Sequence, residues 1–467
     1  MEKLTAKYLY RMLWRWHFYA GIFAIPFVTI LSITGALYLF KPQLDAIHDA
    51  PYRNLNITGS LATPEQQVAV AFGVVPNASF VGYELPREKN DAVNILLNKS
   101  GETIRVYVNP QTLDVLSVES EEKRFLRVVH DIHGELLLGR FGSILVELAA
   151  CWAIVLVLTG IYLWWPRSAQ GVAGIIYPRF KLKGRLFWRD LHSVVGIWIS
   201  LFVLFLLVSG LPWAFVWGNA FTEVRELTGT ASPKQDWTIA GHHQTAAVDH
   251  SEHAGHTMHA APVENSDAHV EHHHHENPNV NPGVFKAIVS LDTIVASAQQ
   301  LQLTYPVVVA PPSQNSAEWT AVSNSQNRAQ RAEAYFSAST GELVNYQDFS
   351  QRHILDRVVG IGVSAHEGQL FGWLNQLLGL LTAIGLIAIS VSGFIMWRKR
   401  APDGILGAPP ALPEAKIGKG FIAIILIAAI LLPVMGISLV VVLIIERLIF
   451  SRWTSAKNWL GLGVLQK

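Results

Sequence analysis

Five long apolar segments divide the chain, and polar stretches of very different lengths separate them. Each segment exceeds the roughly 20 residues that a helix needs to cross a bilayer. This pattern predicts a polytopic membrane protein with helical spans in a lipid bilayer. The apolar segments are Phe18–Phe40, Ser143–Trp165, Val194–Trp217, Phe371–Trp397 and Gly420–Ile445.

Lysine and arginine residues gather in the shorter stretches between these segments. Because such residues mark cytoplasmic loops, we expect the N-terminus, residues 166–193 and residues 398–419 in the cytoplasm. The longer stretches, Lys41–Gly142 and Gly218–Leu370, are then expected outside, which in a bacterium is the periplasm. The pattern predicts a multi-pass inner-membrane protein with a cytoplasmic N-terminus.

The fifth apolar segment allows two paths. Pro433 lies in its middle, and the tail at residues 446–467 carries Arg447, Arg452 and Lys457. A single kinked span would carry this basic tail outside, against the charge bias, whereas a bent re-entrant hairpin would keep it inside. We predict one kinked span.

Both outer stretches contain alternating apolar and polar residues that are typical of strands. In the first stretch, Ala92–Leu97 and Ile104–Asn109 flank a turn, and Thr63-Pro64-Glu65 is a helix-start pattern. In the second stretch, Trp319–Val322 and Ala334–Ser337 alternate in the same way. Two small α+β modules are therefore predicted, one in each outer stretch.

Composition narrows the function classes. Hydrophobic residues make up 51% of the 467 residues and charged residues only 15%, which is too apolar for an ordinary soluble protein. The net charge of +1 gives no reason to expect nucleic-acid binding. The single cysteine, Cys151, excludes an intrachain disulfide and a cysteine-ligated iron–sulfur cluster within one chain.

An internal repeat relates the two halves of the chain, and histidines mark it. His17 and His192 open the first and third spans, and each is followed by glycine in the pattern H-x3-G. A Thr-Gly or Ser-Gly pair ends 18 positions after each of these histidines. The matching residues are Gly21 and Gly196, then Thr34-Gly35 and Ser209-Gly210.

A second set of distances repeats in the returning spans. His133 and His366 precede the second and fourth spans, and each is followed by glycine in the pattern H-x5-G. The pairs Thr159-Gly160 and Ser392-Gly393 end 27 positions after these histidines. The chain is thus expected to be a mainly α membrane protein, with a four-helix core of two repeated helix pairs, a fifth C-terminal span and two α+β modules.

The repeat predicts two histidine pairs at two depths. A pseudo-twofold axis along the membrane normal would pair His17 with His192 inside and His133 with His366 outside. Each pair can supply two axial imidazoles to one b-type haem, and bis-histidine ligation suits electron transfer. His130 lies one helical turn before His133 and is the alternative outer ligand. Duplication of a purely structural unit is the competing explanation.

A histidine-rich tract in the second outer stretch spans residues 242–275. Its few apolar residues cannot form a core, so we expect a flexible loop that either captures zinc, copper, nickel or iron or serves as a solvated linker. The candidate ligands are His242, His243, His250, His253, His256, His259, His269, His272, His273, His274 and His275.

With these motifs in view, the chain resembles the PepSY-associated transmembrane family, over about Trp14–Arg400. The resemblance is carried by Trp16-His17, His133-Gly134-Glu135-Leu136-Leu137-Leu138-Gly139, Leu158-Thr159-Gly160-Ile161-Tyr162-Leu163-Trp164-Trp165-Pro166-Arg167, Asp190-Leu191-His192 and His366-Glu367-Gly368-Gln369-Leu370-Phe371-Gly372. It implies an inner-membrane protein with PepSY-type outer modules. The reductase members of the family imply haem-mediated delivery of electrons to ferric siderophores, or to another metal complex, in the periplasm.

The sequence predicts no sizeable cytoplasmic domain and has no G-x-G-x-x-G motif after a predicted strand, so a reductase of this kind would need a separate cytoplasmic electron donor or a membrane quinol. Two other classes stay open. One is a regulatory membrane protein with structural histidines, and the other is a metal transporter fed by the histidine-rich tract. The transporter is disfavoured because Glu147 is the exception in spans that otherwise lack acidic residues.

Overall fold

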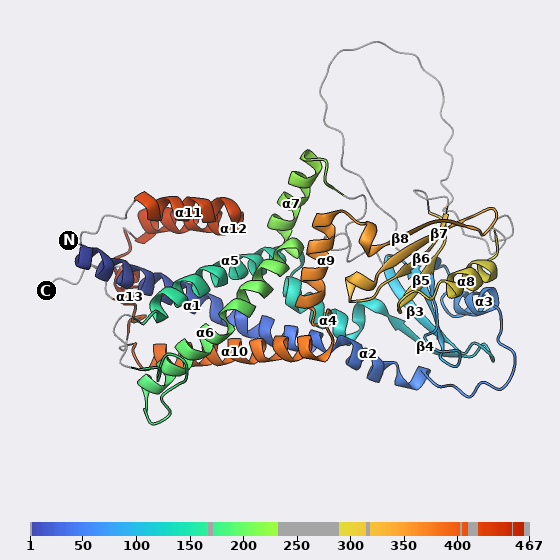
Figure 1. Ribbon diagram of the computed structural model, residues 1–467, viewed down its shortest axis with the longest axis horizontal. Helices are drawn as coiled ribbons and strands as arrows, with labels where there is room; N and C mark the ends of the chain where they lie inside the picture. Colours follow the sequence, from blue (N-terminus) through green and yellow to red (C-terminus); the bar gives the residue numbers. More distant parts are fainter. Residues whose placement is uncertain are drawn as a thin grey trace, which may run out of the picture.

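The computed structural model describes a mostly helical chain with a helical bundle at one end and a sheet at the other (Figure 1). The start of α1 and the short helix α13 (Thr454–Trp459) lie at the end of the bundle that is remote from the sheet. The described residues are 2–166, 171–231, 289–313, 318–401, 404–409, 419–450 and 452–461.

Four long helices form the bundle, and all four are long and apolar enough to cross a membrane. This confirms a multi-pass membrane protein with four of the predicted spans. Neighbouring helices pack in a ring, with α1 between α5 and α10 and with α6 opposite it. Helices that are equivalent in the repeat therefore lie diagonally across the bundle. The four are α1 (Glu2–Leu39), α5 (Gly139–Trp164), α6 (Arg185–Gly210) and α10 (Trp373–Arg398).

The third span ends earlier than the predicted Trp217. Helix α6 stops at Gly210, the short helix η3 (Leu211–Trp213) follows, and α7 (Phe215–Leu227) leaves in a new direction (Figure 1). Pro212 cannot donate a backbone hydrogen bond, which favours the break. The Glu147 carboxylate accepts hydrogen bonds from the backbone N–H groups of Val216 and Trp217, at 2.8 and 3.1 Å. The acidic residue of span two thus caps α7.

The fifth apolar segment bends sharply at Leu432 instead of forming one kinked span. Helices α11 (Lys419–Leu431) and α12 (Pro433–Ile445) both extend from the bend toward the end of the bundle where α1 begins (Figure 1). Gly436 permits this bend, because a Cβ atom there would lie 2.9 Å from the carbonyl oxygen of Ala429.

The tail after α12 returns to the start of the first span. The Tyr19 hydroxyl donates to the carbonyl of Leu460 at 2.6 Å, and Arg15 donates to the carbonyl of Gly461 at 3.2 Å. The arrangement therefore follows the re-entrant alternative, and it keeps the basic tail beside the N-terminal end of α1.

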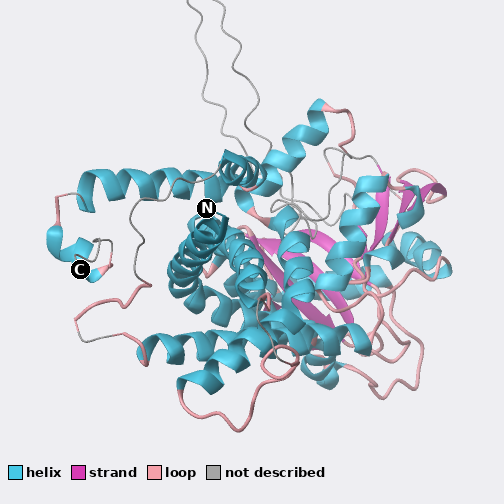
Figure 2. Ribbon diagram, turned by 60° about the vertical axis from the view of Figure 1, so that its left-hand side comes forward, coloured by secondary structure: helices cyan, strands magenta, loops and turns pink. Residues whose placement is uncertain are grey.

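The two outer stretches form one sheet rather than two separate modules (Figure 2). Each stretch contributes four antiparallel strands and one helix, and the halves join where β1 pairs with β5 through Tyr83 and Val309. The strand order is β4-β3-β2-β1-β5-β6-β7-β8. The strands are β1 (Ser79–Glu84), β2 (Val93–Lys99), β3 (Glu102–Val108), β4 (Val115–Ser120), β5 (Val307–Ala310), β6 (Glu318–Ser323), β7 (Ala332–Ser337) and β8 (Leu343–Asp348).

Helices α3 (Pro64–Val74) and α8 (Leu291–Gln300) cover one face of this sheet and share its hydrophobic core. Their N-termini cap each other across the join. The Glu65 carboxylate accepts from the N–H of Leu291 at 3.1 Å, and the Asp292 carboxylate accepts from the N–H of Glu65 at 2.9 Å. The two halves are thus tied together by strands and by helices.

Each half of the sheet leads into the bundle through one short helix. Helix α4 (Phe125–Glu135) connects β4 to α5, and α9 (Ile354–His366) connects β8 to α10. His133 lies in the last turn of α4, and His366 is the last residue of α9. The sheet therefore sets the position of both outer histidines.

Glu84 is a buried carboxylate at the join between the two halves of the sheet. It accepts hydrogen bonds from Arg105 at 2.8 Å, from Tyr305 of the other half at 2.8 Å and from Asn94 at 3.1 Å. Burial alone would raise the pKa of Glu84, but the Arg105 guanidinium and these hydrogen bonds outweigh burial and lower the pKa.

We predict that Glu84→Gln lowers the free energy of unfolding of the sheet by about 3 kcal/mol at neutral pH, because Arg105 then lacks part of its buried charge partner. A lowered pKa stabilises the folded state above the unfolded value of about 4.3, and this stabilisation is lost as the pH falls through the folded value. Hydrogen exchange of β1 and β5 amides as a function of pH measures both effects. Glu102→Gln is the control, because Glu102 is a surface carboxylate whose ion pair with Lys123 is open to solvent. If the exchange of these amides depends on pH in Glu84→Gln as it does in the wild-type protein, the lowered pKa of Glu84 is not a source of stability.

The bend at Leu432 predicts that the tail is on the same side of the membrane as the N-terminus. A membrane-impermeant maleimide should label Ser455→Cys, in α13 (Thr454–Trp459), only from that side. Val344→Cys on the exposed edge strand β8 should be labelled only from the other side. Native Cys151 is buried and gives little background. Labelling of both positions from one side would show that the fifth segment crosses.

Candidate functional site

The bundle brings the four repeat histidines together as two facing pairs. The ring centroids of His17 and His192 are 6.3 Å apart, with an angle of 86° between the ring planes. Those of His133 and His366 are 6.5 Å apart, with an angle of 84°. Each pair takes one histidine from each half of the chain, so both sites lie at the interface between the halves.

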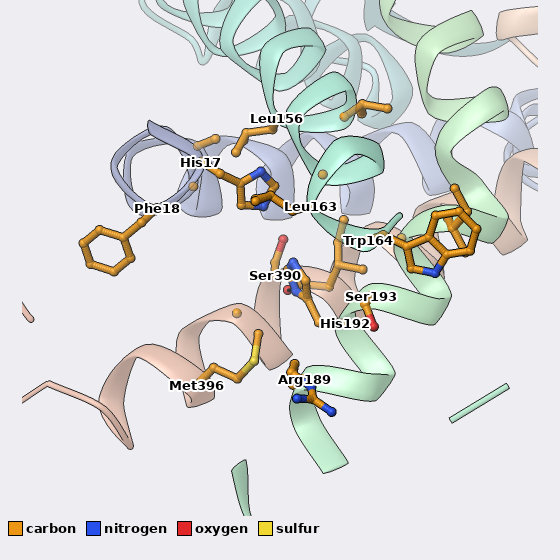
Figure 3. A pocket seen from close by; sticks show the side chains of 18 of the residues that line it. His17, Phe18, Leu156, Leu163, Trp164, Arg189, His192, Ser193, Ser390 and Met396 are labelled. Atoms are coloured by element: carbon orange, nitrogen blue, oxygen red, sulfur yellow. Dashed lines mark hydrogen bonds between the residues drawn. The ribbon is translucent and has the colours of Figure 1, made fainter. Parts of the chain in front are cut away.

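The inner pair borders a cavity of about 550 Å³ (Figure 3). Gly21 and Gly196, one helical turn after His17 and His192, line this cavity. A Cβ atom at Gly196 would meet nothing within 4 Å, and one at Gly21 would meet only the Leu156 side chain at 3.9 Å. The two glycines therefore leave open space in front of the histidines, where a planar group could lie against the helices.

The outer pair borders a second cavity of about 280 Å³. Tyr38 and Trp213, which occupy equivalent positions in the two halves, both line it. The Trp213 ring stands edge-on to the His366 ring, with centroids 5.8 Å apart. The outer cavity thus has an aromatic wall on both sides.

Each of the four repeat histidines contacts a hydroxyl-glycine pair on the partner helix in its own half. Four Nδ1-to-hydroxyl distances describe these contacts: His17 to Thr159 at 2.9 Å, His133 to Thr34 at 3.0 Å, His366 to Ser209 at 3.0 Å and His192 to Ser392 at 3.2 Å. The glycine that follows each hydroxyl residue faces the same ring, and a Cβ atom there would lie 3.2–3.5 Å from Cε1. In the sequence these hydroxyl-glycine pairs establish only the repeat spacings, and their contact with the histidine rings was not predicted.

The hydrogen bonds define which ring nitrogen carries the proton. Thr34, Thr159 and Ser209 donate their hydroxyl protons to backbone carbonyls, at 2.9, 2.7 and 2.7 Å, so their oxygens accept from Nδ1–H. For His192, Nδ1 also donates to the carbonyl of Ile389 at 2.9 Å. Each Nε2 therefore keeps its lone pair, and no hydrogen bond joins these four Nε2 atoms to another described residue. A ring held in this way is prepared to bind a metal through Nε2.

Four apolar residues separate the two cavities, and all four line both of them. Each helix of the bundle contributes one of them, and their positions obey the repeat. Two lie 11 positions after an inner histidine, and the other two lie 20 positions after an outer histidine. We call this layer the collar: Val28, Ala153, Val203 and Leu386. The cavities thus adjoin through one layer of side chains.

His130, the predicted alternative to His133, lines the outer cavity beside Tyr38. Its ring lies 5.6 Å from the Tyr38 ring, and its Nδ1 lies 3.3 Å from an oxygen of Asp131. The geometry therefore favours His133 over His130 as the partner of His366.

The histidine-rich tract, residues 242–275, lies outside the described residues. In the part of the chain that is described, no group of three or more His, Cys, Asp or Glu side chains has the arrangement of a metal site.

The sequence was compared with families of known proteins and with curated proteins. No curated protein matches the chain. A family model described as the PepSY-associated TM region matches residues 14–400, which include both histidine pairs and the whole sheet. The chain therefore belongs to the PepSY-associated transmembrane family.

Proposed function

We propose that this protein is an inner-membrane di-haem reductase that carries electrons across the bilayer to a metal complex on the outer side. The observation that carries the proposal is the pair of facing histidines at each of two depths, with all four Nδ1 atoms engaged and all four Nε2 atoms available.

The separations of the rings fit two imidazoles on one metal ion. A metal–nitrogen bond is about 2 Å long, and an imidazole centroid lies about 1 Å behind Nε2, so two axial rings have centroids about 6 Å apart. The observed 6.3 and 6.5 Å agree with this value. Haem between two imidazoles supplies reversible one-electron transfer and has no open position for oxygen.

Cationic side chains suit the carboxylates of such a cofactor. Arg185, Arg189 and Arg400 line the inner cavity, and Arg127 lines the outer one. The Arg400 Nε atom is buried and has no hydrogen-bond partner among the described residues. Burial and the nearby Arg185 both disfavour the charged form of Arg400, so a carboxylate between them would relieve this cost.

The collar supports transfer between the two sites. Its four apolar side chains exclude water and ions from the region between the cavities. Because the collar is only one layer of side chains thick, the two cavities remain adjacent. In this proposal a separate cytoplasmic donor or a membrane quinol supplies the electron at the His17/His192 site, and the His133/His366 site delivers it outside.

Membership of the family supports a ferric siderophore as the acceptor. Siderophore oxygen donors are hard ligands that prefer the ferric ion. Addition of one electron to the bound ferric ion gives the ferrous ion, which these ligands hold less tightly, and so iron is released.

The first prediction concerns the cofactor itself. The purified protein should show the absorption bands of low-spin b-type haem, with two haems per chain. His192→Ala and His366→Ala should each remove about half of the haem, because each removes one axial ligand from one site. The controls are His130→Ala and His48→Ala; His48 is an exposed residue paired with Glu119, and both variants should keep two haems. Protein without low-spin bands would contradict the proposal and favour a regulatory or transport role.

The second prediction concerns the hydroxyl groups behind the rings. Thr34→Val keeps the shape of the side chain but removes the acceptor for His133, so haem retention at the outer site should fall about tenfold. Thr34→Ser should restore it. Thr29→Val, on the same helix, removes only a hydrogen bond to the Ile25 carbonyl and should have no effect. Equal losses in Thr29→Val and Thr34→Val would show that the effect is structural.

A further inference from the structure

A buried ion pair lies beside the outer histidine pair. Arg328 belongs to the short helix η6 (Arg328–Gln330) between strands β6 and β7, and its guanidinium donates to both carboxylate oxygens of Glu367 at 3.0 and 3.2 Å. Both side chains are almost fully buried, at 3% and 9% exposure. Water therefore screens these two charges weakly.

The sheet holds Arg328 in a fixed position against helix α9. The backbone N–H of Arg328 donates to the hydroxyl of Ser364 at 2.8 Å, and Ser364 is completely buried. Ser364 in turn donates to the carbonyl of Gly360 at 2.9 Å. Backbone and side chain of Arg328 thus both contact the last turns of α9, which end at His366.

Both charges of the pair adjoin the outer site. Glu367 follows His366 directly and lines the outer cavity. The Arg328 guanidinium lies over the Trp213 ring, 5.6 Å from its centroid, and that ring contacts His366. A charge added or removed here would act on the outer site through a medium of low polarity.

The first half of the chain lacks this pair. Gly134 follows His133 at the position equivalent to Glu367, and the turn between β2 and β3, which corresponds to the β6–β7 connection that carries Arg328, consists only of Ser100 and Gly101. The other charged side chains that line the outer cavity lie on helices α4 and α5, and two of them, Arg127 and Asp131, contact each other at 3.3 Å. The Arg328–Glu367 pair therefore breaks the symmetry of the repeat at one ligand only.

We propose that the Arg328–Glu367 ion pair sets the reduction potential of the outer haem, with Arg328 and Glu367 acting as positioning residues behind His366; this inference rests on the proposed function. A carboxylate near the iron stabilises the ferric state and lowers the potential, whereas a guanidinium raises it. Because the charges are paired, their effects oppose each other, and removal of either one exposes the effect of the other.

Potentiometric titration of the full-length haem-loaded protein tests this inference. The outer haem is identified as the component that His366→Ala removes. Arg328→Gln should lower its midpoint potential, Glu367→Gln should raise it, and the double variant should return it close to the wild-type value. Arg328→Lys keeps the charge and should leave the potential nearly unchanged. The inner haem should not respond to any of these variants.

A second buried ion pair on the same helix provides the matched control. Arg225 and Asp356 lie 2.6 Å apart between α7 and α9, and Asp356 is ten residues before His366, or about 15 Å along the helix. Arg225→Gln disturbs α9 without changing the charge at the outer site, so the potential should stay constant.

Shifts of equal sign in Arg328→Gln and Glu367→Gln would overturn the inference, as would an unmoved outer potential in both. Either result could be obtained with two haems bound, so it would leave the proposed function intact. Protein that binds no low-spin haem would overturn the proposed function instead.

Discussion

The geometry of the two histidine pairs depends on the hydrogen bond between Nδ1 of each repeat histidine and a hydroxyl on the partner helix. Within each half the exchange is reciprocal: α1 carries His17 and supports His133, while α5 supports His17 through Thr159. The second half repeats the exchange between α6 and α10, through Ser209 and Ser392. Each half is thus a unit that orients two imidazoles, and the cavities arise where the two units meet.

The sheet extends this organisation outside the bundle. Strands β1 and β5 join the halves, and the short helices α4 and α9, which follow the two halves of the sheet, carry the outer histidines. The inner histidines, His17 and His192, lie within long spans and have no such connection. Side chains of the sheet region can therefore act on the outer site, and we infer that Arg328 does so through its contact with Glu367.

The repeat distances allowed the histidine pairs to be predicted because antiparallel helices convert sequence spacing into depth. A hydroxyl-glycine pair 18 positions after an inner histidine lies at the level of the outer histidine, and one 27 positions after an outer histidine lies at the inner level. Apolar length likewise predicted five spans, and four of them are present among the described residues. The hydroxyl-to-ring contacts could have been inferred from the same distances, since Thr34 and His133 must meet if the helices are antiparallel.

Other features depend on contacts that local patterns do not encode. The pairing of Tyr83 with Val309 joins strands more than 200 residues apart, so two separate modules were expected where one sheet forms. The bend at Leu432 had a visible signal in Pro433 and in the basic tail, but its geometry depends on the close approach of Gly436 to Ala429. Arg328 lies in a short turn between strands, and nothing in its neighbourhood indicates that it reaches Glu367.

Electron paramagnetic resonance of the oxidised, purified protein tests the central claim most directly. Imidazole planes at 86° and 84° are nearly perpendicular, which leaves two iron d orbitals almost equal in energy. We therefore predict two highly anisotropic low-spin ferric signals, one lost in His17→Ala and the other in His133→Ala. A rhombic low-spin signal from parallel imidazoles, a high-spin signal or no haem signal would contradict the facing-pair arrangement as the site of electron transfer.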